Sequence, residues 1–217
     1  MEVSDVIKAR RSVRQYLDKP IEEDKKVALK DYIDLLNARY KTNVQIFFDD
    51  ENAFSNSTAA YGLFSSCKNI VALVGKDEET CGYAGELFAL KAQSVGLNTC
   101  FVGLTYKKGN IKRKIKLQKG EKVQCCIALG YGKTQGAKRK SKKPSDVLVL
   151  KGEKPKLLDE VVEACLLAPT AINQQKFKVV CENGDIEIVK SGFGFYAGVD
   201  IGIVKCHKDL ILGKVSL

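Results

Sequence analysis

The sequence lacks the features that would indicate a metal site, a membrane span or secretion. Its 217 residues include one histidine, His207, and eight cysteines without a CxxC pair, so a Cys/His zinc site of the usual spacing is excluded. No run of roughly 18 apolar residues occurs, and residues 1–12 lack the apolar stretch of a signal peptide. Because most cysteines lie in apolar runs, we expect free thiols in a reducing, cytoplasmic setting. From the preceding absences we expect no bound metal and no membrane partner.

The remaining composition is that of an ordinary globular protein. Tryptophan is absent and methionine occurs once, and neither fact is informative. Hydrophobic residues make up 45% of the chain and charged residues 29%, which is enough to build a sizeable core. The length predicts one domain or two tightly joined halves.

The net charge of +10 is concentrated in residues 107–122 and 133–143. A basic balance favours anionic partners, although such runs are also typical of a solvated surface. A nucleic-acid-binding domain is therefore a rival hypothesis. We expect no nucleic-acid partner, because aromatic residues do not interleave with the basic runs and no recognition motif is present.

Hydrophobic periodicity predicts a mixed architecture. Helical spacing indicates helices over residues 4–11, 22–36, 81–95, 158–165 and 199–210, the first capped by Ser4 and the third ended by Gly96. Short apolar runs indicate strands over residues 44–48, 70–74, 99–102, 124–129, 177–181 and 186–189. The Asn183-Gly184 pair predicts a hairpin between the last two strands. Helices combined with antiparallel hairpins indicate an α+β fold.

The N-terminal segment Arg10-Arg11-Ser12-Val13-Arg14 carries three guanidinium groups and a hydroxyl. Arginine offers a planar fork of donors that matches phosphate oxygens, so this segment is a candidate anion site. The alternative interpretation is an exposed basic helix end. Lys138 and Arg139 form a candidate second clamp on the same anion.

Two further segments could hold a flat ligand. Residues 168–175 join a helix to a strand, and Asn173 and Gln175 supply donors and acceptors there. Gly103 follows a strand and could expose backbone N–H groups to a ligand. The alternatives are an ordinary connecting loop and a turn glycine.

Taken together and in order, these segments resemble the nitroreductase-like FMN proteins. The resemblance rests on RRSVRQY, YAGELFALKAQSVGLNTCFVG, the basic stretch AKRKSKKPSDVL, and LLAPTAINQQKF, in which Thr170 stands where the family commonly has Ser. It implies an α+β fold in which a mostly antiparallel sheet is flanked by helices. It also implies bound FMN as cofactor and NAD(P)H as electron donor.

One departure from the family concerns the order of the motifs. The family commonly forms an intertwined homodimer, with FMN between the subunits and both motifs near the N-terminus. Here the arginine segment and the Pro169 loop stand on opposite halves of one chain. We therefore expect a single domain over residues 1–217 that imitates the dimer, with residues 1–150 as the phosphate side and 151–217 carrying the loop. The expected state is a monomer with this internal pseudo-dimer, or a homodimer, with one flavin per chain.

The resemblance also implies roles for individual residues. Arg10, Arg11 and Ser12 would face the phosphate and ribityl chain, and Arg14 the pyrimidine side of the flavin. Lys138 and Arg139 would close on the phosphate. Pro169, Thr170, Ala171 and Asn173 would cover the ring edge and ribityl hydroxyls, with Gln175 binding or only orienting the loop. Val102 and Gly103 would present backbone N–H groups near the flavin N5. No side chain is expected to act as a catalytic acid, base or nucleophile, and His207 is expected to pack in the core.

The implied function is an FMN-dependent oxidoreductase that passes hydride from NAD(P)H to a small electron-poor acceptor. Nitroaromatics, quinones and similar small molecules are candidate acceptors, and NADH and NADPH both remain candidate donors. The alternative is a non-catalytic flavin-binding or flavin-sensing protein of the same fold.

Overall fold

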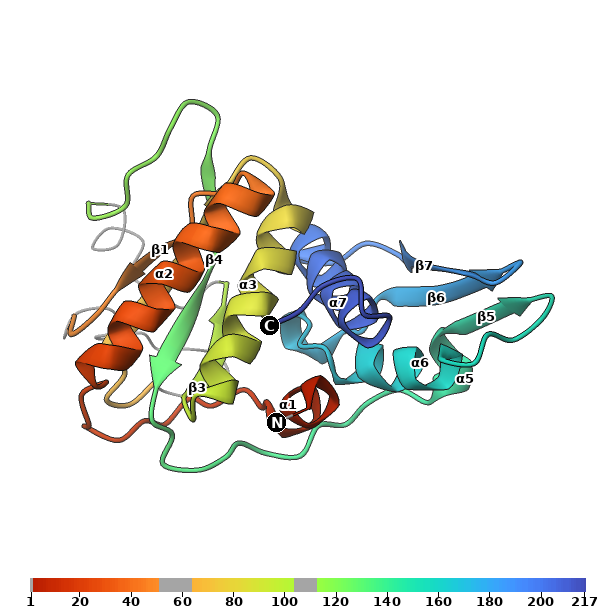
Figure 1. The fold of residues 1–217 in the computed structure, drawn as a ribbon, viewed down its shortest axis with the longest axis horizontal. Helices are drawn as coiled ribbons and strands as arrows, with labels where there is room; N and C mark the ends of the chain where they lie inside the picture. The colour runs from red at the N-terminus through yellow and green to blue at the C-terminus, as the bar shows by residue number, and fades with distance from the viewer. Residues whose placement is uncertain (1, 51–63, 104–112) are drawn as a thin grey trace.

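The computed structural model describes residues 2–50, 64–103 and 113–217, so residues 107–112 of the first basic run lie outside the described residues. The described helices are α1 (Val3–Ala9), α2 (Glu23–Tyr40), α3 (Glu78–Ser94), α5 (Pro144–Val147), α6 (Leu158–Leu167), the 3-10 turn η1 (Ala171–Asn173) and α7 (Ala197–Ile211). The strands are β1 (Gln45–Phe47), β2 (Asn69–Gly75), β3 (Asn98–Val102), β4 (Lys122–Gly130), β5 (Leu148–Lys151), β6 (Phe177–Glu182) and β7 (Asp185–Lys190). The elements form an α+β fold, as predicted (Figure 1).

The larger sheet has the strand order β1-β2-β4-β3, and every neighbouring pair is antiparallel. All seven residues of β2 are buried. Val71 and Leu73 belong to the main core cluster, whereas Ile70 and Val74 belong to a second cluster. Because alternate side chains of a strand point to opposite faces, both faces of this sheet are covered.

The smaller sheet pairs β5 with β6 in parallel and β6 with β7 as a hairpin. Asn183 and Gly184 both have positive φ, at 51° and 88°, which is the backbone of the predicted hairpin turn. The periodicity did not predict β5 or the short helix α5. Both are brief, and β5 gains its strand conformation from parallel pairing with the distant β6.

Helices α3 and α7 lie side by side between the two sheets (Figure 1). Glycines allow this close approach. A Cβ atom on Gly82 would lie 2.1 Å from the carbonyl oxygen of Val199, and one on Gly202 would lie 1.8 Å from that of Glu79. No real contact is that short, so the glycines are required where the two helix backbones meet.

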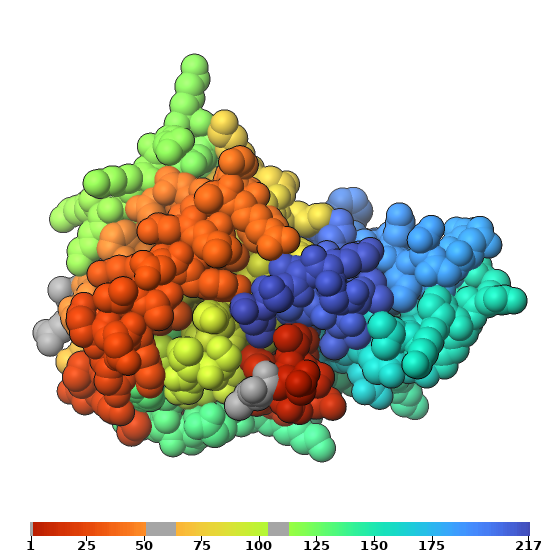
Figure 2. Space-filling view, viewed as in Figure 1, coloured from red at the N-terminus to blue at the C-terminus, as the bar shows by residue number. Residues whose placement is uncertain are grey.

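Helix α1 is held against α3, α6 and α7, and in the space-filling view it fills the space below α7 and beside the end of α3 (Figure 2). The main core cluster contains residues from both 1–150 and 151–217, including Leu87 and Phe88 of α3 and Ile203 and Val204 of α7. The internal pseudo-dimer itself stays a prediction.

One expectation about helix ends is wrong. Ser4 does not cap α1, because the helix already begins at Val3 and Glu2 occupies the capping position without a side-chain bond. Gly96 does follow the end of α3 with a φ of 82°, as expected for a left-handed stop. Across the described ranges, none of the helices has the length and apolar character needed to cross a membrane.

Candidate functional site

The N-terminal segment continues the larger sheet beyond β3. Ser12 forms a parallel bridge with Thr99, and the Val13 N–H donates to the Thr99 carbonyl at 3.0 Å. This pairing places the arginine segment beside the start of β3. Gly103 follows four residues after Thr99, about 13 Å further along at the rise of an extended strand.

Arg10 is not an exposed helix-end arginine. It follows directly after α1 and is only 1% exposed. Its Nε lies 3.3 Å from Oε1 of Glu86, a fully buried residue of α3. Helix packing has therefore carried one of the predicted arginines into the protein, where it meets a carboxylate.

Arg139 lies against the same segment. One of its guanidinium nitrogens donates to the carbonyl oxygen of Arg10, which also accepts from Nη1 of Arg11 at 3.1 Å. Gly136 permits the approach, because a Cβ there would lie 2.6 Å from the Cβ of Arg11. Burial, followed by the positive charge of Arg10, lowers the pKa of Arg139 to about 9. The structure thus brings Arg10, Arg11 and Arg139 together; their role toward a phosphate stays a prediction.

Two donors of this cluster remain unsatisfied. Within the described ranges, Arg10 Nη1 and Arg139 Nη1 are buried and have no hydrogen-bond partner, whereas Arg10 Nε has the 3.3 Å ion pair with Glu86. A buried polar group is costly to leave without a partner, and a buried cation more so. The cluster therefore has the chemistry of a site for an anion with several acceptor oxygens, such as a phosphate.

The loop after α6 is held by Asp200 of α7. The Ala171 N–H donates to both carboxylate oxygens, at 2.9 and 3.1 Å, and Gln174 Nε2 donates to Oδ2 at 2.7 Å. Burial raises the pKa of Asp200 to about 6, against the opposing effect of these hydrogen bonds. Thr170 contributes from within the loop, where its Oγ1 accepts from the Gln175 N–H at 3.0 Å.

Residues 138–142 connect this loop to the arginine cluster. Asn173 Nδ2 donates to the Lys140 carbonyl at 2.6 Å, and Gln175 Oε1 accepts from the Lys142 N–H at 2.7 Å. The neighbouring Arg139 reaches Arg10. One short segment therefore contacts both predicted halves of the site. Gln175, which is 1% exposed, also donates to the Leu166 carbonyl at 2.9 Å, so its amide orients the loop.

The end of β3 meets the start of α7. Val102 is buried, and the Tyr196 hydroxyl donates to the Gly103 carbonyl at 2.6 Å. A Cβ on Gly103 would lie 2.4 Å from the Tyr196 ring, so only glycine fits beneath it. Tyr196 itself adopts a left-handed backbone, with a φ of 57°, directly before α7.

The remaining predicted residues lie at the edges. Ser12, Pro169 and Thr170 are half-buried, whereas Arg14 and Lys138 are exposed. Sequence reasoning did not identify Glu86, Asp200 or Tyr196. Of these three, only Glu86 could have been identified from the sequence, because it is a charged residue within the mostly apolar helical stretch 84–92.

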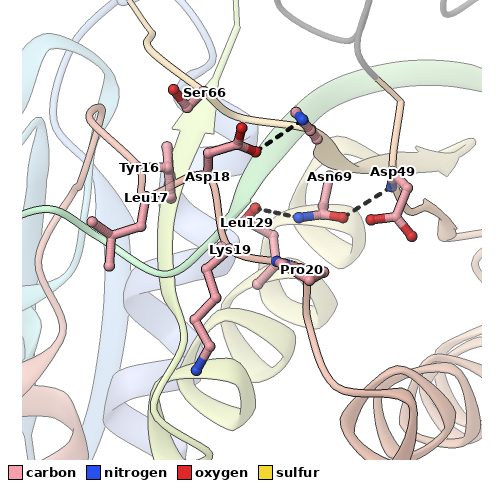
Figure 3. Close-up of a pocket in the computed structure, with 11 residues that line it drawn as sticks. Tyr16, Leu17, Asp18, Lys19, Pro20, Asp49, Ser66, Asn69 and Leu129 are labelled. Atoms are coloured by element: carbon pink, nitrogen blue, oxygen red, sulfur yellow. Dashed lines mark hydrogen bonds and ion pairs between the residues drawn. The ribbon is translucent and has the colours of Figure 1, made fainter.

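A separate hollow of about 270 Å³ lies just after the arginine segment in the chain, where residues 16–20 form part of its lining (Figure 3). Its lining includes Asp18, Asp49 and Asn69, and none of the predicted cofactor residues. Asp18 pairs with Lys68 at 2.9 Å, and Asn69 bridges the Asp49 N–H and the Leu129 carbonyl. Asp18, Lys19, Asp49 and Asn69 all form ion pairs or hydrogen bonds within the protein, so the hollow is a weaker candidate than the arginine cluster. In the part of the chain that the structure describes, no group of three or more metal-ligating side chains occurs.

Comparison with protein-family models identifies one family. Residues 2–211 match the family described as "Putative TM nitroreductase". A solved "putative nitroreductase" from Thermotoga maritima is 20% identical with a TM-score of 0.69, and the match covers 99% of this chain and 85% of that one. A search of curated proteins found no match.

Two other solved structures share part of the fold. A "putative nitroreductase in complex with FMN" from Desulfovibrio desulfuricans is 15% identical with a TM-score of 0.54, over 70% of this chain and 98% of that one. A "Putative NADH dehydrogenase/NAD(P)H nitroreductase" from Parabacteroides distasonis is 16% identical with a TM-score of 0.53, over 67% and 95%. At these identities the likeness shows the fold alone.

Proposed function

Because this chain belongs to the family described as "Putative TM nitroreductase", we propose that it is an FMN-dependent oxidoreductase using NAD(P)H as electron donor. The electron acceptor would be a small electron-poor molecule such as a nitroaromatic or a quinone. The cofactor is suggested by the FMN complex of the Desulfovibrio relative, and the donor by the printed description of the Parabacteroides relative.

The proposal is carried by Arg10 Nη1 and Arg139 Nη1, which are buried and have no hydrogen-bond partner among the described residues. A phosphate would supply the acceptors that these donors lack in the described part of the chain. The residues present therefore fit the phosphorylated end of FMN. Arg11 stands beside them, and its side chain is half-buried.

Other residues would hold the rest of the cofactor. The loop over residues 169–173 would cover the ring edge and the ribityl chain, because Asp200 and Gln175 fix its backbone. Val102 and Gly103 would place backbone N–H groups near the reactive edge of the ring. Arg14, which is exposed, would lie on the pyrimidine side.

The chain's own contribution is binding, orientation and electrostatics. Bound FMN would supply the redox chemistry, since flavins transfer hydride equivalents that side chains cannot. No acid or base is assigned to a side chain. We further propose that each chain holds one FMN, in line with the internal pseudo-dimer.

The direct test is the absorbance spectrum of the purified protein, with flavin counted per chain and NAD(P)H oxidation followed with a nitroaromatic or a quinone. One flavin per chain with steady turnover supports the proposal. Reduction of the flavin without turnover would support the alternative, a flavin-binding or flavin-sensing protein. A colourless protein that takes up no FMN when it is added would overturn both.

A matched pair of variants tests the phosphate site. Arg139→Gln removes a half-buried charge of the cluster, whereas Lys133→Gln removes an exposed charge of the same segment. Arg139→Gln should weaken FMN binding by at least about tenfold, and Lys133→Gln should leave it unchanged. Equal affinities in the two variants would place the phosphate elsewhere.

A further inference from the structure

A fully buried cluster lies behind the arginines. Oε1 of Glu86 is 2.8 Å from Nε2 of His207 on α7 and 3.3 Å from Nε of Arg10. Nδ1 of His207 lies 2.7 Å from the Ala164 carbonyl oxygen of α6. The side chains of Arg10, Glu86 and His207 are at most 1% exposed, so water does not screen these contacts.

The distances determine how many protons the cluster holds. A carbonyl oxygen can only accept, so Nδ1 of His207 must carry a hydrogen to make its 2.7 Å contact. Nε2 and Oε1 are 2.8 Å apart, and a hydrogen bond of that length requires a second proton between them. The imidazole and the carboxyl group therefore share one proton more than a neutral ring and a carboxylate would hold.

The second proton belongs on the imidazole. If Glu86 took it, Arg10 would be a buried cation without a counter-ion, which costs several kcal/mol. An ionised Glu86 instead pairs with Arg10 and His207 together. Asp209 is the acidic group that also acts on the neighbouring Cys206, and it is already paired with Lys208 at 3.2 Å and accepts from the Tyr83 hydroxyl at 3.1 Å. Arg139 is cationic, and burial raises the pKa of the Cys206 thiol well above its ordinary value, so that thiol stays protonated.

We propose that His207 is an imidazolium, protonated at both ring nitrogens, and that Glu86 and His207 are positioning residues for the phosphate of the bound flavin. One carboxylate between two cations leaves the cluster with one excess positive charge. Glu86 fixes the Arg10 guanidinium, whose Nη1 stays available, and His207 keeps the carboxylate from cancelling the charge of the site. The role of Glu86 and His207 toward phosphate rests on the proposed function. The protonation of His207 does not, because it is argued from the hydrogen bonds of the ring alone.

The imidazolium is directly observable, because His207 is the only histidine of the chain. In the nitrogen-15 NMR spectrum of the cofactor-free protein, both ring nitrogens should show the shifts of protonated nitrogen. Glu86→Gln removes the carboxylate and should release the second proton. A neutral ring in the unmodified protein would overturn the proposal.

The role toward phosphate is tested by His207→Gln, because a glutamine amide keeps two N–H donors and carries no charge. The variant should bind FMN about tenfold more weakly and riboflavin, which lacks the phosphate, with unchanged affinity. Inorganic phosphate should likewise raise the unfolding temperature of the unmodified protein more than that of the variant. Equal losses for both flavins and for phosphate would make the role merely structural and overturn it. If the unmodified protein binds no flavin, the proposed function fails, while the NMR result still decides the state of His207.

Discussion

Replacing Arg139 with methionine should stabilise the cofactor-free protein and weaken FMN binding. Methionine keeps much of the side-chain volume and removes the buried charge. Burial and Arg10 lower the pKa of Arg139 from 12.5 to about 9, which corresponds to about 5 kcal/mol of unfavourable free energy while the group stays charged. This cost is present at every pH below about 9 and disappears only as the pH rises toward 12.5.

Part of this gain is offset, because methionine loses the charged hydrogen bond to the Arg10 carbonyl. Such a bond contributes about 1.5–3 kcal/mol, which leaves a net stabilisation of about 2–3.5 kcal/mol. In a chain of this size the unfolding temperature should rise by about 4–14 °C. The same positive charge destabilises the cofactor-free protein and favours binding of an anion. Its removal should therefore raise stability and lower affinity.

The assay is thermal unfolding of the cofactor-free protein at neutral pH, followed by FMN titration of the same samples. Lys133→Met is the control, because Lys133 is exposed on the same segment and its replacement should change stability by less than about 0.5 kcal/mol. The reasoning is refuted if Arg139→Met lowers the unfolding temperature while FMN affinity is retained.

Three further perturbations test the frame around the site. The pKa of Asp200 is raised from 3.8 to about 6 in the folded protein, so the wild type should lose up to about 3 kcal/mol of stability as the pH rises between these values. Urea unfolding of Asp200→Asn should show a clearly smaller loss over the same range, and an identical loss would contradict the assignment. Gly202→Ala forces a Cβ against the Glu79 carbonyl and should lower the free energy of unfolding by at least about 1–3 kcal/mol. The measurement is the unfolding temperature, and an unchanged value would show that α3 and α7 do not pack as closely as described. Tyr196→Phe removes the 2.6 Å bond to Gly103 and should cost about 1 kcal/mol with the flavin count per chain unchanged, whereas loss of the flavin would give the hydroxyl a direct role.

Local patterns predicted most of the secondary structure. The i, i+3, i+4 spacing located α2, α3, α6 and α7, because a helix that packs on a core must be apolar along one face. The Asn183-Gly184 pair located the hairpin, because few other residues tolerate positive φ at two successive positions. Elements that depend on distant partners were missed, as β5 shows by pairing in parallel with β6.

The motifs of the candidate site were visible, but their surroundings were not. Arg10 and Arg139 were expected to share an anion, and the structure does bring them into contact. That Arg10 would also meet Glu86 could not be read from the chain, because 76 residues separate them. His207 is buried as expected, and its two hydrogen-bonded ring nitrogens could not be read from the chain.

The sequence by itself determined most of the segments: where most helices and strands form, which turn joins β6 to β7, and where along the chain the apolar faces lie. These properties depend on neighbours a few residues apart. Only the tertiary structure decided that α1, α3 and α7 would enclose Arg10, Glu86 and His207 away from water. Burial and proximity across distant segments set the protonation and pairing of charged groups, and both arise only when the helices pack.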